Sequence, residues 1–169
     1  MLVEQATPVA FDDWVRARSA ALQRFAYLIT GDAAEAPDLV QEALAQAWPR
    51  WSSLASRGTA EAYVRRSIVN ASISRWRSAG RHLVALDPER FGGGVVPGAD
   101  SGVDDADAAW RLCATLPPSQ RAAVVLRFYE DLAFAEIAVV LDCAEATARS
   151  HVHRALRSLR TRLGEMSDD

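Results

Sequence analysis

The chain has 169 residues, a net charge of −3 and 50% hydrophobic residues. This composition excludes a disordered chain, and the length allows one domain or two small ones with a buried core. The slightly acidic net charge argues against indiscriminate binding of polyanions. We expect a soluble, cytoplasmic protein without membrane insertion, because no signal peptide precedes Phe11 and no apolar run approaches the roughly 20 residues that cross a bilayer.

Strand patterns are almost absent, and the first half of the chain shows helical periodicity. Apolar residues at helical spacing between Phe11 and Ile29 predict a first helix that stops near Gly31. Pro37 suits the first turn of a second helix, where its missing N–H has no partner to lose, and Pro49 ends that helix. These signals predict an all-α fold.

The second helix carries a polar and acidic ridge opposite its leucines. The ridge consists of residues spaced three and four positions apart, namely Asp38, Gln41, Glu42 and Gln46. A solvated helix face explains this pattern without any partner. A surface on which a basic helix of a partner docks explains it as well.

A loop containing residues 56–59 leads to a third predicted helix at about residues 60–79. Arginines that suit phosphate contacts and aromatic rings that suit base stacking are interspersed along it: Tyr63, Arg65, Arg66, Arg75, Trp76 and Arg77. Asn70 suits pairing with a base edge. The helix therefore fits single-stranded or melting DNA. The alternative assigns Tyr63 and Trp76 to the core and Asn70 to a local cap.

The segment that follows differs in composition from its surroundings. Residues 91–107 hold five glycines and a proline among acids, and they show no periodicity. Residues 65–82 and 146–163 each carry five arginines and no acid, so the acidic segment separates two basic blocks. We predict two small helical domains, residues 1–86 and 107–169, joined by a flexible linker at 87–106 that lets them move relative to one another.

The last third of the chain reads as a helix-turn-helix. A short helix at residues 134–141 and a turn at 142–144 precede a longer helix that begins at Glu145. One face of the longer helix is apolar: Ala148, Val152, Leu156, Leu159 and Leu163. The opposite face is basic: Arg149, His153, Arg154, Arg157 and Arg160. The pattern predicts duplex DNA binding, and the alternative is an amphipathic helix with a solvated basic face.

Residues suited to catalysis or metal binding do not cluster. Cys113 and Cys143, the only cysteines, form no Cys-x-x-Cys pair and no cluster with histidine, so we expect no metal site. The glycine run at 92–94 lacks the lysine and serine of a phosphate-binding loop. The three histidines lie in arginine-rich segments that we expect to be exposed. We therefore expect no cofactor and no enzymatic activity.

Together the two modules resemble an extracytoplasmic-function (ECF) RNA polymerase sigma factor of the actinobacterial SigE-like group. Residues 11–32, 37–48 and 62–81 are similar to the family's region 2, and residues 116–160 are similar to its region 4. The most specific segments are the Asp-Leu-Val-Gln-Glu run at 38–42 and the Leu-Pro-x-x-Gln-Arg opening at 116–121.

The resemblance implies binding to core RNA polymerase and to promoter DNA, with an anti-sigma factor as a further possible partner. The surface that clamps the coiled coil of the largest polymerase subunit would comprise Asp38, Leu39, Gln41 and Glu42. Contacts to the −10 element, including a pocket for a flipped base, would comprise Leu54, Arg65, Arg66, Asn70, Arg75 and Arg77. Contacts to the −35 element would comprise Thr147, Arg149, Ser150, His153, Arg154 and Arg157.

Two positions depart from the family's pattern. Leu54 stands where the family's base-capturing loop usually has an aromatic or similarly large side chain, and Ala146 replaces the glycine that usually opens the recognition helix. The alternative function is a helix-turn-helix regulator that binds an operator without engaging core polymerase. The first half of the chain discriminates the two, because a plain regulator needs neither the acidic ridge nor the arginine- and aromatic-rich helix.

Overall fold

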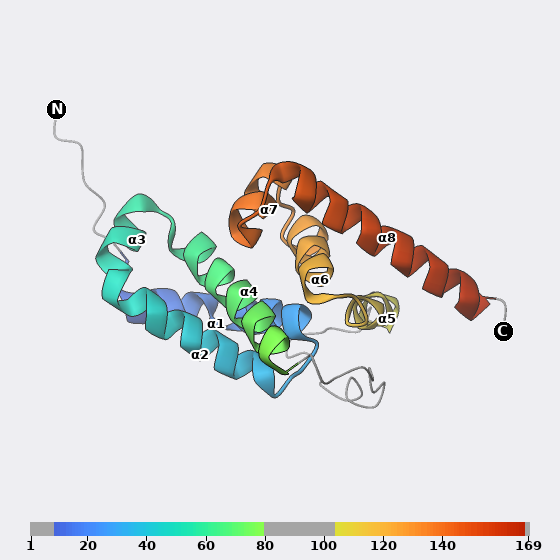
Figure 1. The fold of residues 1–169 in the computed structure, drawn as a ribbon. Coiled ribbons are helices and arrows are strands. Elements are labelled where there is room, and N and C mark those ends of the chain that lie inside the picture. Colours follow the sequence, from blue (N-terminus) through green and yellow to red (C-terminus); the bar gives the residue numbers. More distant parts are fainter. Residues whose placement is uncertain (1–8, 80–103, 168–169) are drawn as a thin grey trace.

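The computed structural model describes residues 9–79 and 104–167, and all its regular elements there are helical (Figure 1). The N-terminal half comprises α1 (Phe11–Thr30), α2 (Glu35–Ala47), the 3-10 turn η1 (Trp48–Arg50), α3 (Trp51–Arg57) and α4 (Ala60–Ala79). The C-terminal half comprises α5 (Asp104–Cys113), α6 (Pro118–Val124), the π-helical turn η3 (Val125–Tyr129), α7 (Phe134–Leu141) and α8 (Glu145–Ser167). The predicted all-α fold is confirmed. Most of the predicted linker at 87–106 lies outside the described residues.

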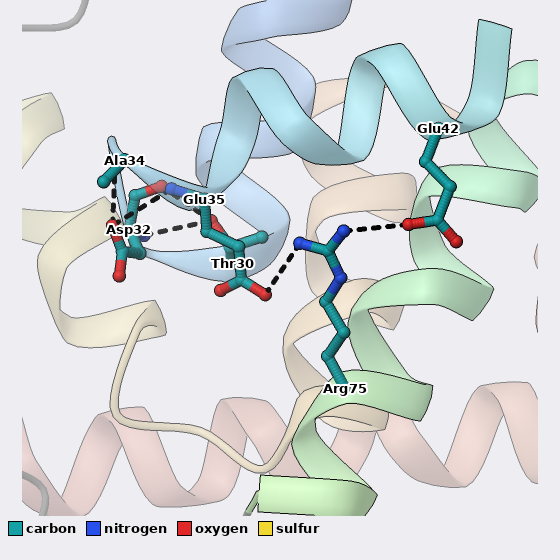
Figure 2. Close-up of polar contacts among 6 residues, drawn as sticks. All are labelled: Thr30, Asp32, Ala34, Glu35, Glu42 and Arg75. Atoms are coloured by element: carbon teal, nitrogen blue, oxygen red, sulfur yellow. Dashed lines mark hydrogen bonds and ion pairs between the residues drawn. The ribbon is translucent and has the colours of Figure 1, made fainter. Parts of the chain in front are cut away.

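The corner between α1 and α2 is built from local hydrogen bonds. Gly31 adopts a left-handed conformation (φ 71°), and its N–H donates to the carbonyl of Tyr27 at 2.7 Å, which ends α1. The Asp32 carboxylate then accepts hydrogen bonds from the N–H groups of Ala34 (2.8 Å) and Glu35 (3.2 Å) at the start of α2 (Figure 2). These bonds satisfy donors that a helix start otherwise leaves unpaired. They explain why the predicted boundary near Gly31 is confirmed.

The core of the N-terminal half lies where α2 packs against α1 and α4. The apolar faces predicted for the first three helices supply its fully buried side chains, among them Leu22, Phe25, Leu39, Val64 and Ile68. Helical periodicity therefore predicted most of the inward faces of this half correctly. It was wrong for Trp48, which it placed on the buried face of the second helix and which is 61% exposed. The same pattern predicts that the opposite faces of these helices are exposed, and these faces carry the polar residues considered below.

The loop predicted at residues 56–59 is wrong in its first two residues, which are helical, and the family's loop at 54–59 is helical up to Arg57. Helix α3 continues to Arg57, and only Gly58 and Thr59 separate it from α4. Gly58 adopts a left-handed conformation (φ 67°), and the N–H of Thr59 donates to the carbonyl of Leu54 at 3.0 Å. This glycine cap closes a short helix in a segment whose serines and glycine suggested a loop. Leu54 is half-buried against the core.

The C-terminal half contains the predicted helix-turn-helix. Helix α7 has the predicted bounds, and its turn begins at Asp142 in a left-handed conformation (φ 52°). Ala148, Val152 and also Ala155 of α8 are buried, which confirms the apolar face at the start of that helix. Leu163 is 51% exposed, because the end of α8 projects beyond the elements that cover its beginning (Figure 1). The predicted apolar stripe is therefore wrong at that position.

The two halves pack against one another. Helix α4 contacts α2 on one side and α6 and α7 on another, and α1 contacts α6 and η3 (Figure 1). The larger buried apolar cluster takes residues from both halves, including Ile68 and Val69 of α4 and Ile137 of α7. The sequence predicted two modules that can move relative to one another. The structure shows them in one closed arrangement.

Candidate nucleic-acid and partner interfaces

The acidic ridge predicted on α2 is largely exposed. Asp38, Gln41, Glu42 and Gln46 all lie at the surface of the helix. Leu39 does not belong to this surface: its side chain is fully buried, because its position faces α1 and α4. The structure therefore corrects the assignment of Leu39 to a docking surface and leaves the polar side chains available to a partner.

Arg75 connects α4 to this ridge. Its Nη2 donates to Glu42 Oε2 at 2.8 Å, and its Nη1 lies 3.6 Å from Glu35 Oε1 (Figure 2). All three side chains are about one-third or more exposed, and pairs of this kind contribute about 0.5 kcal/mol each. The predicted polymerase surface and the predicted −10 surface thus meet at Glu42 and Arg75. A partner or a DNA phosphate can replace so weak a contact at little cost.

A groove of about 510 Å³ runs between α2 and α4 and brings several predicted residues together. Glu42, Tyr63, Arg66 and Asn70 are among the side chains that line it. Asn70 lies in the middle of α4 and is exposed, so it is not a helix cap. Trp76 is 52% exposed, which excludes the alternative that assigned it to the core. Tyr63 is half-buried against the core, so for this residue the alternative holds in part.

Arg65 and Arg66 are engaged by acids. Arg65 Nη2 lies 2.7 Å from Glu61 Oε1 within α4 and 2.6 Å from Glu130 Oε2, which belongs to the C-terminal half. Arg66 Nη2 lies 3.8 Å from Asp142 Oδ1 in the helix-turn-helix turn. Burial raises the pKa of Glu130, and the nearby Arg65 lowers it in opposition. The structure therefore holds two of the four predicted −10 arginines against the other half of the chain.

The predicted −35 side chains all lie on the exposed side of α8. They are opposite the buried Ala148, Val152 and Ala155, and comprise Thr147, Arg149, Ser150, His153, Arg154 and Arg157. This is the arrangement that a helix entering the major groove needs, since its inner face holds the domain together while its outer face meets base edges. The helical spacing of the apolar residues was a sufficient signal for this surface.

Arg149 is positioned by its own domain. Its Nη2 lies 3.1 Å from Glu145 Oε1 one turn earlier, and its guanidinium carbon lies 4.7 Å from the centre of the Phe134 ring. The guanidinium carbon of Arg127 lies 4.5 Å from the same ring. Sequence reasoning missed this arrangement, because Phe134 looks like one more apolar residue of α7. Cation–π contacts restrict the rotamers of a side chain at the predicted readout position.

Arg121 is the most buried charged residue among those that the structure describes, and sequence reasoning gave it no role. It donates four hydrogen bonds, from Nη1 to the carbonyls of Ile29 (3.1 Å) and Thr30 (2.7 Å) and from Nη2 to those of Ala114 (2.6 Å) and Leu116 (3.2 Å). Burial lowers its pKa to about 10, so it remains charged at neutral pH. The available signal was an arginine directly followed by five apolar residues that continue a buried helix.

His151 departs from the expectation that the histidines are exposed. It is half-buried, and burial lowers its pKa, with a smaller effect of the same sign from Arg154. Together with Asp142 it lines a groove opposite Asn70 and Arg77 of α4. The groove lies between the two halves, so His151 takes part in their junction.

The described residues contain no group of three or more histidine, cysteine or acidic side chains that could hold a metal ion. No helix within residues 9–79 and 104–167 has both the length and the apolar character that crossing a membrane requires. The exposed arginines and amides suit nucleic acid, and the carboxylate ridge suits a basic partner.

The comparison with known families assigns both halves. Residues 14–82 match the family Sigma-70 region 2, and residues 106–159 match the family Sigma-70, region 4. The chain is 36% identical to the RNA polymerase sigma-E factor of Streptomyces avermitilis, over 90% of this chain and 84% of that protein. It is 31% identical to the ECF RNA polymerase sigma factor SigE of Mycolicibacterium smegmatis, over 98% of this chain and 66% of that protein.

Solved structures extend the similarity to the fold. The sigma factor RpoE in complex with the anti-sigma factor NepR, from Bartonella quintana, superposes with a TM-score of 0.71 at 25% identity, covering 91% of this chain and 96% of that one. The ECF sigma factor SigJ of Mycobacterium tuberculosis superposes with a TM-score of 0.61 at 30% identity, covering 88% of this chain and 53% of that one. The chain belongs to the family of ECF RNA polymerase sigma factors.

Proposed function

We propose that this chain binds core RNA polymerase and directs it to a dedicated class of promoters, by recognising −35 and −10 elements and promoting strand opening. The observation that carries the proposal is the presence, on one chain, of both sigma regions with their exposed surfaces: the α2 ridge and α4 in region 2, and α8 in region 4. A regulator that only binds an operator needs α8 alone. The protein acts by binding polymerase and DNA, with no chemical step of its own.

We divide the chain into region 2 at residues 1–86, a linker at 87–106 and region 4 at 107–169. The family matches at 14–82 and 106–159 support this division. Helix α5 begins at Asp104, so the helical part of the second unit starts inside the end of the proposed linker. Polymerase and chromosome are the partners, which places the protein in the cytoplasm. An anti-sigma protein is a further candidate partner, since the Bartonella relative is complexed with one.

The polymerase contact is assigned to the exposed carboxylates and amide of α2. Asp38, Gln41 and Glu42 point away from the core, and a coiled coil of the largest polymerase subunit would meet them as a basic helix meets an acidic one. Buried Leu39 supports this surface from behind by packing against the core. We assign it a structural role.

The −10 contact is assigned to the α4 side of the groove. Asn70 and Arg66 lie on the groove wall, and Arg77 is exposed about two turns beyond Asn70 along α4. An extruded base in the groove would meet the Asn70 amide, while arginines hold the adjoining phosphates. Leu54 packs partly into the core and offers an apolar contact without an aromatic face.

The −35 contact is assigned to the exposed face of α8. Arg149, held by Glu145 and Phe134, is the strongest candidate for a bidentate contact to a guanine. Arg157 lies two turns later and suits a phosphate contact. The remaining exposed members of the set, Thr147, Ser150, His153 and Arg154, lie between and beside them.

The decisive experiment is capture of purified core polymerase by the full chain, followed by run-off transcription from genomic promoter fragments. The proposal expects a stable complex and discrete transcripts that core polymerase alone does not make. The operator-binding alternative expects duplex binding without either result. An absence of both polymerase binding and transcripts, with the protein folded, overturns the proposed function.

A further inference from the structure

One aromatic ring of the helix-turn-helix contacts two arginines. Phe134 is the first residue of α7, and its ring centre lies 4.5 Å from the guanidinium carbon of Arg127 and 4.7 Å from that of Arg149. The ring is half-buried and packs against the core, whereas the Arg149 side chain is 52% exposed. A guanidinium over an aromatic ring is attracted by the electron-rich ring face. Phe134 therefore holds an exposed arginine of α8 from a neighbouring helix.

The position of this ring is fixed by the chain that leads to it. The N–H of Leu132 donates to a main-chain carbonyl of η3 at 3.0 Å, and the carbonyl of Leu132 accepts a hydrogen bond from Nη1 of Arg127 at 2.9 Å. One residue later, the N–H of Ala133 donates to Glu136 Oε2 at 2.8 Å, which caps the start of α7. Arg127 thus binds the backbone at Leu132 and contacts the ring two residues further on. The ring of Phe134 is therefore a fixed part of the domain surface.

Arg149 is held from two helices. Glu145 Oε1, one turn earlier on α8, lies 3.1 Å from its Nη2, and Phe134 contacts its guanidinium from α7, which packs against α8 (Figure 1). Arg154 and Arg157 on the same exposed side of α8 have no ion pair or aromatic contact within the part of the chain that the structure describes. Ordering a long side chain on binding costs free energy, and an arginine that is ordered beforehand avoids part of this cost. Arg149 differs from its neighbours on α8 in this respect.

We propose that Phe134 is a positioning residue for promoter recognition: its ring, supported by Arg127, orients the guanidinium of Arg149 toward a base edge and so sets the sequence discrimination of α8. The proposal rests on the proposed function for its DNA ligand. A bidentate contact to guanine needs two N–H groups aligned with two acceptors, so the orientation of the guanidinium decides whether one bond or two bonds form. Loss of the ring then weakens cognate binding and leaves the phosphate contacts of other arginines intact.

The test removes the ring from the full chain and keeps an apolar side chain in its place. Phe134→Leu loses the ring face, whereas Phe134→Tyr retains it and should restore the parent behaviour. The matched control is Phe128→Leu, the same change at a 55% exposed ring of η3. Anisotropy titrations compare a −35 duplex, taken from a promoter that run-off transcription identifies, with an unrelated duplex and with duplexes that carry one substituted base pair. Without DNA, the NMR order parameter of the Arg149 Nε–H group measures the fast motion of the side chain.

Phe134→Leu should weaken binding to the cognate duplex about fivefold, as expected when one long side chain is no longer ordered before binding, and should change binding to the unrelated duplex less than about twofold. The loss should concern the same base pair as that of Arg149→Ala, and Phe134→Leu should cause no further loss in the Arg149→Ala background. The Arg149 order parameter should fall in Phe134→Leu and stay at the parent value in Phe134→Tyr and Phe128→Leu. Arg127→Met, which leaves the ring in place, should lower both quantities to a smaller extent.

Equal losses on cognate and unrelated duplexes would overturn the proposal, because the ring would then support the whole domain and not one arginine. Additive losses in the double variant, or an unchanged Arg149 order parameter in Phe134→Leu, would overturn it as well. Parent-like behaviour of Arg127→Met would remove the supporting role of Arg127.

Failure of the proposed function gives a different result. In that case neither the parent chain nor any variant would bind core polymerase or support run-off transcription, while the difference in the Arg149 order parameter between Phe134→Leu and the control would persist. Helicity measured by circular dichroism confirms that each variant is folded before either comparison is made.

Discussion

Helices α4 and α8 carry the two arginine-rich faces of this chain, and the structure uses them differently. On α8 the predicted side chains are exposed, and the contacts of Arg149 come from its own domain. On α4, Arg65 and Arg66 contact acids of the other half, and Arg75 contacts acids of α2. Equal density of arginine therefore does not mean equal availability. In this arrangement the face of α8 predicted to bind duplex DNA is exposed. The face of α4 predicted to bind single-stranded DNA is partly covered by the C-terminal half.

The largest effect is expected on the acidic ridge of α2, which lies beside α4. Asp38→Arg combined with Glu42→Arg should weaken binding to core polymerase roughly 1,000-fold, because two carboxylates facing a basic partner become repulsive. Pull-down or interferometry with core polymerase measures it. Asp38→Arg alone keeps the Glu42–Arg75 pair, and Asp13→Arg is the matched reversal on α1. Parent-like affinity in a folded double variant would remove the docking assignment.

Arg121→Met tests the connection between α6 and the end of α1, which joins the two halves. We expect the free energy of unfolding to fall by about 3 kcal/mol, since four carbonyls lose a charged donor. Chemical denaturation followed by circular dichroism measures it, with Arg111→Met on the exposed face of α5 as control. Equal denaturation midpoints for the two variants would show that Arg121 contributes packing alone.

On α8 the prediction separates base readout from phosphate contact. Arg149→Ala should cost about 1–3 kcal/mol on the cognate −35 duplex and little on an unrelated one. Arg160→Ala, further along the exposed side, should weaken binding to both duplexes similarly. Anisotropy titrations on the two duplexes provide the four affinities. The same sequence dependence for both variants would contradict this division of α8.

Asn70→Ala addresses the groove wall of α4. Binding to closed duplex promoter should stay near that of the parent, whereas open-complex formation should fall about tenfold, since the lost contact forms only after a base has left the stack. Permanganate footprinting of the polymerase complex reports the melted bases. Ser74→Ala, which lines the same groove, is the control. A normal bubble in the Asn70 variant would exclude base capture by this residue.

The smallest effect is the sharpest test of the contrast between the helices. Glu130→Gln with Asp142→Asn should change the affinity of α8 for −35 duplex less than about twofold, because the recognition face is exposed in the closed arrangement. The same titrations used for Arg149 measure it. A gain of about fivefold or more would mean that the closed arrangement masks α8 as well, and the contrast would disappear.

Local sequence signals were sufficient for most of the helices and for the exposed face of α8. Periodicity over a few turns, Gly31, Pro37 and Pro49 predicted these helices and their order, because these signals act between residues that are neighbours along the chain. They failed at α3, where the glycine cap at Gly58 lets a short helix form in a polar segment, and at the π-helical turn η3. The assignment of Leu39 to a docking surface was wrong, because it came from family similarity and not from the position of Leu39 on its helix.

Which arginines are available was decided by tertiary structure alone. Arg121 bonds to a carbonyl 92 positions away, and Arg65 meets Glu130 only because the two halves pack together. Periodicity describes the faces of single helices, and it holds no information on which face of one half meets which face of the other. The sequence therefore determined two helical units and the buried and exposed faces of α8. The packing of α6, η3 and α7 on α1 and α4 decided that the arginines of α4 have acids as partners.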